Sequence, residues 1–328
     1  MEQEKYNEFV ARRVSLKDAV PLDRPLSVFI EPTNKCTFKC ISCPLSLPNY
    51  TEIRQSRTMR YEEFERIVEL IKEDFKRVKR LNFYMIGEPL LHKDIVKMIR
   101  KAKQEDIAER IVISTNGSLL ESVDTESLLS SGVDYINISI YGADEKSFKE
   151  STNSKYSLEE ILSAISKLVR LRDITNSQVN INCSIFKDEN AKKIKDKLVE
   201  ICDGVFEKHL MDWTEKEGSF TKNFKPLSER KSIKTCPMPF FQMVIHSDLK
   251  VSICCNDYAQ RLVVGDLRNQ RPVEIWNGLK WNLIRSSILL YGYKSISACR
   301  TCYTPEYTYD EDNLDELSFQ TYLSRIET

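Results

Sequence analysis

The sequence predicts an α/β fold, a partial (β/α)6 barrel of the TIM type followed by a small C-terminal α+β domain. Short apolar runs rich in β-branched and aromatic residues alternate with longer runs of helical periodicity from residue 27 to about residue 213. This alternation is typical of parallel strands whose connecting helices cover the sheet. Six such units are fewer than the eight of a complete barrel. Beyond a polar segment, two more β runs and a helical run predict the smaller domain.

The predicted elements follow one another in this order along the chain. The six barrel strands are expected at 27–31, 81–85, 111–115, 135–140, 179–186 and 206–211. The clearest helices are expected at 61–78, 158–171 and 190–202. In the C-terminal domain a hairpin is expected from 240–245 and 250–254, and a helix over 273–290. These elements divide the chain into an N-terminal extension (1–24), the barrel (25–213), a linker (214–235) and a C-terminal domain with an acidic tail (236–328).

Composition and charge restrict the partners and the compartment. Lys+Arg and Asp+Glu both total 49, so no net field attracts the protein to nucleic acid or to a membrane. No run approaches 18 apolar residues, and the charged N-terminus lacks an apolar signal region. We therefore expect a cytoplasmic protein. Ten cysteines in a reducing cytosol indicate metal binding or catalysis and not a disulfide framework.

The first cysteine cluster follows the first predicted strand, in the segment EPTNKCTFKCISCP. Cys36, Cys40 and Cys43 have the spacing C-x3-C-x2-C, and a loop lets all three sulfurs point inward. Thiolates select iron–sulfur clusters, zinc or Cu(I). A structural zinc site needs four ligands, and no other Cys or His lies between residues 1 and 50. Three thiolates would leave one iron of a [4Fe–4S] cluster open for a substrate or cofactor.

This arrangement resembles the signature of the radical S-adenosylmethionine (SAM) superfamily. Further segments extend the resemblance, each at the end of a predicted strand: Gly87-Glu88-Pro89 resembles the family's GGEP motif, with Ile86 in place of the first Gly. Ser114 and Asn116, in STNG, match a segment near the SAM ribose, and Ser139 matches a polar residue that touches SAM. Ser42 stands where the family often has an aromatic residue. The resemblance implies that these residues bind SAM and that the cluster held by the cysteines chelates it through the open iron.

The chemistry that the resemblance implies is reductive cleavage of SAM. A one-electron donor of the flavodoxin or ferredoxin type reduces the cluster, and a 5′-deoxyadenosyl radical then abstracts a hydrogen from the substrate. The cofactors supply the chemistry, while the protein orients the reacting atoms and excludes water.

A second group of cysteines lies in the C-terminal part: Cys236, Cys254, Cys255, Cys299 and Cys302. Four thiolates form a complete set for an iron–sulfur cluster, and equally for structural zinc. The segment resembles the SPASM/twitch domain in its form with one auxiliary cluster, which we expect to be of the [4Fe–4S] type. The resemblance implies Cys236, Cys254, Cys299 and Cys302 as ligands. The family's usual Gly five residues before the second ligand is Leu249 here.

Other residues are candidates for the substrate and for catalysis. Cys255 is either a small buried residue or a thiol that donates a hydrogen atom to a substrate radical. Glu31 ends the first strand, and Asp212 and Trp213 follow the sixth, so all three are expected to face the substrate pocket. The three histidines, Cys183 and Cys202 are expected to be structural.

The family resemblance implies oxidation or epimerisation of a small hydroxylated compound, such as a carbohydrate or an aminocyclitol. In oxidation a base takes a proton and the auxiliary cluster takes an electron, whereas in epimerisation a thiol returns a hydrogen atom. Two alternatives stay open: a peptide-modifying enzyme, and a non-catalytic iron–sulfur electron carrier that would not cleave SAM.

Overall fold

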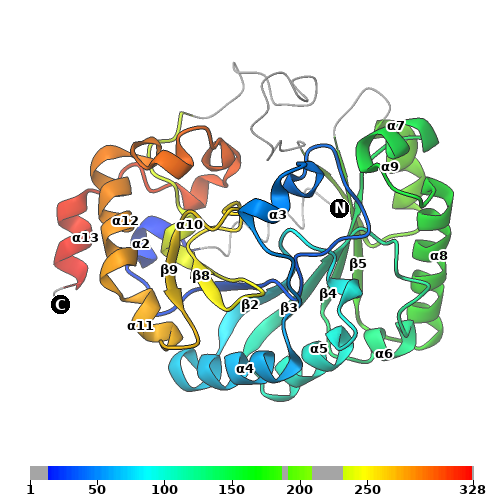
Figure 1. Ribbon diagram of the computed structural model, residues 1–328, viewed down its shortest axis with the longest axis horizontal. Coiled ribbons are helices and arrows are strands. Elements are labelled where there is room, and N and C mark those ends of the chain that lie inside the picture. Colours follow the sequence, from blue (N-terminus) through cyan, green and yellow to red (C-terminus); the bar gives the residue numbers. More distant parts are fainter. Residues whose placement is uncertain (1–13, 187–190, 209–231, 327–328) are drawn as a thin grey trace.

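The computed structural model describes residues 14–186, 191–208 and 232–326. Within these ranges a single nine-stranded sheet has the order β6-β5-β4-β3-β2-β1-β7-β8-β9 (Figure 1). The first six strands pair in parallel in sequence order, as the alternating pattern predicted. Their bounds are β1 (Ser27–Ile30), β2 (Val78–Phe83), β3 (Ala108–Thr115), β4 (Tyr135–Ile140), β5 (Asn180–Phe186) and β6 (Gly204–Lys208).

Helices cover the outer face of the parallel strands (Figure 1). α4 (Tyr61–Phe75) shows why they lie there: Phe64, Ile67, Val68 and Ile71 recur on one side, and each is at most 1% exposed. The helix ends earlier than position 78 because Lys76 adopts a positive φ of 60°. The other barrel helices are α5 (Ile95–Gln104), α6 (Thr125–Leu129), α7 (Glu145–Thr152), α8 (Leu158–Ile174) and α9 (Ala191–Val199).

The predicted hairpin does not form a separate sheet. β7 (Gln242–Ile245) pairs in parallel with β1, and β8 (Lys250–Ser252) and β9 (Val263–Asp266) continue the same sheet in antiparallel fashion. Leu249, in the turn before β8, has a φ of 68°. Glycine adopts this left-handed conformation without strain, so the backbone keeps the shape that the family's usual glycine favours.

The single helix expected over 273–290 is two helices, which corrects that prediction. α11 (Pro272–Trp276) ends at Asn277, and α12 (Leu279–Tyr291) begins after Gly278. The apolar periodicity continues across the break, so the pattern alone did not reveal it. Arg285 of α12 donates a hydrogen bond from Nη1 to the carbonyl oxygen of Trp276 at 3.1 Å, which satisfies an acceptor exposed by the end of α11.

Shorter elements connect these parts and complete the C-terminal region. No helix among the described residues is both long and apolar enough to cross a membrane. The short helices are α2 (Leu16–Ala19), α3 (Tyr50–Ile53), α10 (Met238–Phe241) and α13 (Phe319–Ile326), and the 3-10 turns include η1 (Pro44–Ser46), η2 (Pro89–Leu91), η6 (Ser297–Cys299) and η7 (Thr304–Tyr307).

Candidate active site

A cavity of about 300 Å³ opens at the carboxyl ends of the parallel strands. Parallel α/β folds place their ligands at this edge, because the loops that follow each strand meet there. The loop after β1 contributes three cysteines to its wall, and the loops or ends of β2 to β6 contribute the rest. The cavity is lined by Cys36, Phe38, Cys40, Ser42, Cys43, Tyr84, Met85, Ile86, Gly87, Glu88, Ser114, Thr115, Asn116, Ser139, Tyr141, Ser184, Phe186 and Lys208.

Gly87 lets the loop after β2 press against the cysteine loop. A Cβ atom at this position would lie 2.0 Å from the carbonyl oxygen of Thr33 and 2.7 Å from that of Lys35. The amide of Glu88 donates to the same Lys35 oxygen at 2.8 Å. Only glycine permits this approach of two backbones, so the residue fixes one wall of the cavity directly beside Cys36.

Glu88 binds protein backbone inside the same wall. Its carboxylate accepts hydrogen bonds from the Leu90 amide, the Thr115 hydroxyl and the Asn116 amide at 2.7 to 3.0 Å. Burial raises its pKa from 4.5 to about 7, although these three donors act in the opposite direction. The side chain therefore joins the loops after β2 and β3.

The three cysteines of the first loop are crowded and mostly shielded from water. Burial, with the neighbouring acidic group and thiols, raises the pKa of Cys36 to about 12, and burial raises that of Cys43 to about 11. Burial and the other two thiols raise the pKa of Cys40 further. Three thiolates can coexist here only with a cationic partner. The amide of Phe38 also approaches the Cys36 sulfur at 3.4 Å.

The second set of cysteines meets on the C-terminal side of the sheet. Cys236 precedes α10, Cys254 follows β8, and Cys299 and Cys302 lie in and after η6. Burial raises the pKa of Cys236 and of Cys299, and the other thiols of the set add to both shifts. The Asn256 amide approaches the Cys254 sulfur at 3.4 Å. Four partly buried thiols with a backbone donor close to one of the sulfurs fit an iron–sulfur cluster.

Comparison with known proteins decides the family. The model of the radical SAM superfamily matches residues 30–198, about half of the chain, and the model of the SPASM iron–sulfur cluster-binding domain matches residues 236–303. The chain belongs to the radical SAM superfamily. As a member with a SPASM domain, this radical SAM enzyme holds a [4Fe–4S] cluster that binds SAM and an auxiliary iron–sulfur cluster.

Curated relatives resemble this radical SAM enzyme over part of their length. A probable GTP 3′,8-cyclase of Thermoplasma volcanium is 29% identical over 205 residues, covering 61% of this chain and 57% of that protein. One from Pyrococcus abyssi is 32% identical over 140 residues, covering 42% of each. The chain therefore spans about half the length of the curated relatives that it matches.

Solved structures resemble it in fold. BtrN in complex with AdoMet and 2-DOIA has a TM-score of 0.55 at 17% identity, covering 82% of this chain and 89% of that chain. Streptococcus suis SuiB bound to the precursor peptide SuiA has a TM-score of 0.57 at 17% identity, with coverages of 94% and 80%. anSMEcpe with bound AdoMet has a TM-score of 0.59 at 16% identity, with coverages of 92% and 95%.

In the part of the chain that the structure describes, no three His, Cys, Asp or Glu residues form a group tight enough to bind one metal ion. A four-iron cluster spans a larger volume than one ion, and its cysteine ligands bind different corners. Within each cysteine set, burial and the neighbouring thiols raise the pKa of Cys40 and of Cys236.

The structure brings together most of the residues expected to bind SAM. Gly87, Glu88, Ser114, Asn116 and Ser139 line the cavity together with the three cysteines. The side-chain amide of Asn116 donates to the Thr37 hydroxyl at 3.0 Å and approaches the Cys36 sulfur at 3.5 Å. Pro89 is buried at the start of η2 and does not line the cavity.

The residues expected in the substrate pocket lie elsewhere or outside the described ranges. Glu31 is 0% exposed, and Arg54 and Ser247 bind its carboxylate, so it does not line the cavity. Its expected position in the substrate pocket is thereby corrected: the end of β1 is covered by the loop after β7. Asp212 and Trp213, like His209, lie outside the described residues.

Cys255 packs in a cluster with residues of the cavity wall. It packs in one apolar cluster with Cys43 and with Tyr84, and Tyr84 lines the cavity. Cys255 itself is not among the described residues that line the cavity. Cys183 and Cys202 lie elsewhere, with their sulfurs 3.3 Å apart.

Sequence reasoning missed Lys208, Ser184, Tyr141 and Phe186, which also line the cavity. Tyr141 and Phe186 stack with ring centroids 4.8 Å apart. Desolvation near the cavity and the positive charge of Arg80 lower the pKa of Lys208 from 10.5, although the residue as a whole is exposed at the end of β6. One signal was present for two of them: Phe186 ends the predicted strand 179–186 and Tyr141 follows the predicted strand 135–140, and catalytic groups of such folds collect at these ends.

Proposed function

We propose that this radical SAM enzyme dehydrogenates an alcohol carbon in a small hydroxylated compound, of the carbohydrate or aminocyclitol class. The observation that carries the proposal is Lys208, an amine at the end of β6 in the same cavity as Cys36 and Ser139. A lysine whose pKa is lowered from 10.5 offers a neutral amine more readily at physiological pH. It is the base that the sequence alone did not identify.

We infer roles for the other residues in the cavity. Cys36, Cys40 and Cys43 hold the cluster that chelates SAM, while the Gly87 loop, Ser114, Asn116 and Ser139 bind SAM itself. Cys236, Cys254, Cys299 and Cys302 hold the auxiliary cluster. Tyr141 and Phe186, stacked on one another, form an apolar wall that restricts where a substrate carbon lies.

Oxidation of an alcohol to a ketone removes one hydrogen atom, one proton and one electron. The bound cofactors supply the acceptors for two of these: the SAM-derived radical for the hydrogen atom and the auxiliary cluster for the electron. Lys208 takes the proton of the substrate hydroxyl. As the O–H bond breaks, the carbon–oxygen single bond becomes a double bond. The proton leaves as ammonium on Lys208, which solvent at the cavity mouth can discharge.

Epimerisation at the same carbon would need a hydrogen donor in place of a base. Cys255 is the thiol expected for it, and it is not among the described residues that line the cavity, whereas Lys208 is. The position of Lys208 therefore supports dehydrogenation over epimerisation by Cys255. A peptide, such as the precursor peptide SuiA that SuiB binds, is the other substrate class that the test must include.

The test uses reconstituted enzyme with dithionite, SAM and a panel of aminocyclitols, sugars and short peptides under anaerobic conditions. Dehydrogenation predicts one 5′-deoxyadenosine for each product that is lighter by two hydrogens. A product of unchanged mass that gains one deuterium in D2O would instead establish epimerisation. Formation of 5′-deoxyadenosine only with peptides would overturn the small-molecule assignment.

Changing Lys208 to Met tests the base. Oxidised product should fall at least roughly 100-fold, as expected when a general base is lost, while 5′-deoxyadenosine still forms. Lys195→Met is the matched control, because Lys195 lies on α9 and pairs with Glu207 outside the cavity. Unchanged product formation by the Lys208 variant would show that another group takes the proton.

A further inference from the structure

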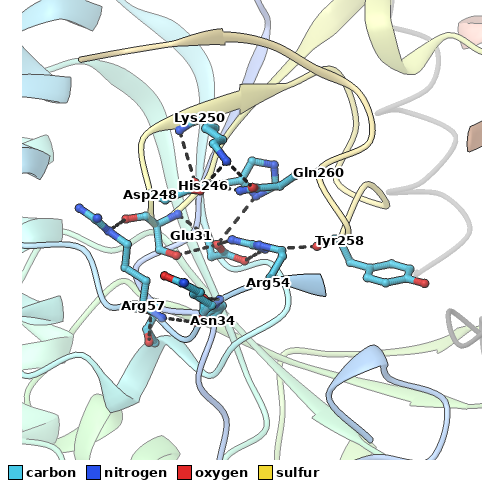
Figure 2. Close-up of polar contacts among 12 residues, drawn as sticks. Glu31, Asn34, Arg54, Arg57, His246, Asp248, Lys250, Tyr258 and Gln260 are labelled. Atoms are coloured by element: carbon cyan, nitrogen blue, oxygen red, sulfur yellow. Dashed lines mark hydrogen bonds and ion pairs between the residues drawn. The ribbon is translucent and has the colours of Figure 1, made fainter. Parts of the chain in front are cut away.

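A buried ion pair of Glu31 and Arg54 lies at the end of β1 and contacts the C-terminal part of the chain (Figure 2). Glu31, directly after β1, accepts hydrogen bonds from Arg54 Nη1 at 3.1 Å and Nη2 at 2.7 Å. The Arg54 side chain is 4% exposed and that of Glu31 is 0% exposed. Arg54 directly follows α3, the helix that comes after Cys43 and η1. The arginine therefore attaches the end of the first cysteine loop to the first strand.

The same ion pair binds the C-terminal part of the chain. Ser247, in the turn between β7 and β8, donates from both its amide and its hydroxyl to Glu31 Oε2, each at 3.0 Å. Arg54 Nη1 also donates to the carbonyl oxygen of Tyr258 at 3.4 Å. Tyr258 lies in the loop that begins with Cys254. Glu31 thus contacts the turn between β7 and β8, and Arg54, which follows the first cysteine loop, contacts the loop that begins with Cys254.

A second set of hydrogen bonds shapes the auxiliary loop from inside. His246 Nε2 lies 2.7 Å from the Ser252 hydroxyl, which donates to Asp257 Oδ2 at 3.0 Å. The Asp257 carboxylate accepts from the amides of Arg261 and Leu262 at 2.7 and 2.8 Å. His246 Nδ1 lies 3.8 Å from Glu31 Oε2, so this set lies beside the ion pair without a hydrogen bond to it.

The electrostatics show that the pair stays charged. Burial alone would raise the pKa of Glu31, but the neighbouring His246 ring and the Arg54 guanidinium hold it well below its usual value. A buried ion pair adds little net stability over an apolar pair of the same volume, whereas loss of one partner leaves a costly unpaired charge. What such a pair does provide is one defined geometry, because both partners are held by directional bonds.

We propose that Glu31 and Arg54 are positioning residues that fix the auxiliary-cluster loop against the SAM-cluster loop and thereby set the distance between the two clusters. The proposal depends on the two clusters of the family, and it does not depend on which substrate is oxidised. The separation of the clusters can be measured in the absence of any substrate.

The experiment measures the dipolar interaction between the two reduced clusters by pulsed EPR in the full-length, reconstituted protein. We compare Glu31→Gln and Arg54→Lys with the parent, and record the midpoint potential of the auxiliary cluster in each. Both variants should keep the iron content of the parent, yet show a changed, broader dipolar distribution and a shifted potential. Ser247→Ala, a milder change that leaves the ion pair intact, should show the same effect to a smaller extent.

Asp74→Asn is the matched control. Asp74 is also a buried carboxylate that joins the barrel to the C-terminal part, since it accepts from Arg271 Nε at 2.8 Å and from the Val273 amide at 3.0 Å. It lies near the end of α4, at the amino end of β2 and away from the cysteine loops. This variant should lose stability without any change in the dipolar distribution.

Two outcomes would overturn the proposal: an unchanged dipolar distribution in all three network variants, or the same change in Asp74→Asn. Failure of the proposed dehydrogenation would leave these measurements as they are, because they use no substrate.

Discussion

At the scale of single residues, Glu88 and Gly87 show what a short motif can and cannot predict. Both lie in the cavity wall, as expected from the motif. The reason for Gly87 is the approach of the Thr33 and Lys35 carbonyl groups, which belong to another loop and leave no trace in the local sequence. The partners of Glu88 are equally distant, since Thr115 and Asn116 lie at the end of β3 and directly after it.

The raised pKa of Glu88 gives a prediction for stability against pH. Since the folded-state pKa is about 7 and the ordinary value is 4.5, the folded protein holds a proton in this window that the unfolded chain lacks. The contribution of this proton to the free energy of unfolding is therefore complete below pH 4.5 and is lost as the pH rises towards 7. Glu88→Gln removes the titration, so its stability deficit should shrink by up to about 1.4 kcal/mol per pH unit between about pH 5 and 7.

Urea unfolding of the cluster-free protein at several pH values measures this change. Glu63→Gln is the control, because hydrogen bonds from Arg60 and Arg57 lower the pKa of Glu63 despite its partial burial. Glu63 is ionised throughout the window, so the deficit of its variant should stay constant. A constant deficit for Glu88→Gln as well would contradict the prediction.

At the scale of elements, Arg285 organises the helices beside the auxiliary site. Its guanidinium lies 4.1 Å from the centre of the Trp276 ring, and Nε donates to the Pro239 carbonyl oxygen at 3.0 Å. It thereby joins α12 to α11 and to α10, which begins two residues after Cys236. Burial lowers its pKa to about 10, yet the side chain remains cationic at neutral pH.

Arg285→Lys should destabilise the protein by roughly 2–4 kcal/mol, because an ammonium cannot donate to both carbonyl groups while stacked on the indole ring. Thermal unfolding measures this loss, and the iron content should fall through the auxiliary site alone. Arg268→Lys serves as the control, since Arg268 is exposed and pairs with Asp266. Equal effects of the two substitutions would show that Arg285 has no special role.

The sequence predicted the elements better than their ends or their partners. Alternating apolar runs located all six barrel strands because strands of a covered parallel sheet are rich in apolar residues on both faces. Arg285 caps the end of α11 before the break at Gly278, and Arg54 pairs with the buried Glu31. Neither of these contacts joins residues at a sequence spacing that a pattern could reveal. Cysteine spacing revealed the ligand sets, whereas a lone lysine such as Lys208 carried no such signal. The domain boundaries at 213 and 236 stay a prediction.

At the scale of the whole molecule, the two cluster sites share one sheet but use separate ligands. Anaerobically reconstituted protein with two [4Fe–4S] clusters should contain about eight irons. Replacing Cys36, Cys40 and Cys43 by Ala should leave about four, and replacing the four C-terminal cysteines should also leave about four.

Iron and sulfide analysis measures both losses, and replacing Cys183 and Cys202 by Ala provides the control. About four irons in the parent, falling to none in the first variant, would mean that the C-terminal cysteines hold no iron. The protein would then lack the auxiliary cluster, which is the proposed electron acceptor.

The parallel pairing of β1 with β7 has a consequence for biosynthesis. Ile30 pairs with Ile245, so the first strand leaves the ribosome long before the strand that covers its second edge. Until β7 arrives, that edge offers unpaired backbone groups and Glu31 lacks Ser247. Completion of the first cluster loop must therefore wait for the last third of the chain. Delivery of iron and sulfide to the first cysteine loop is then an event that follows the synthesis of β7.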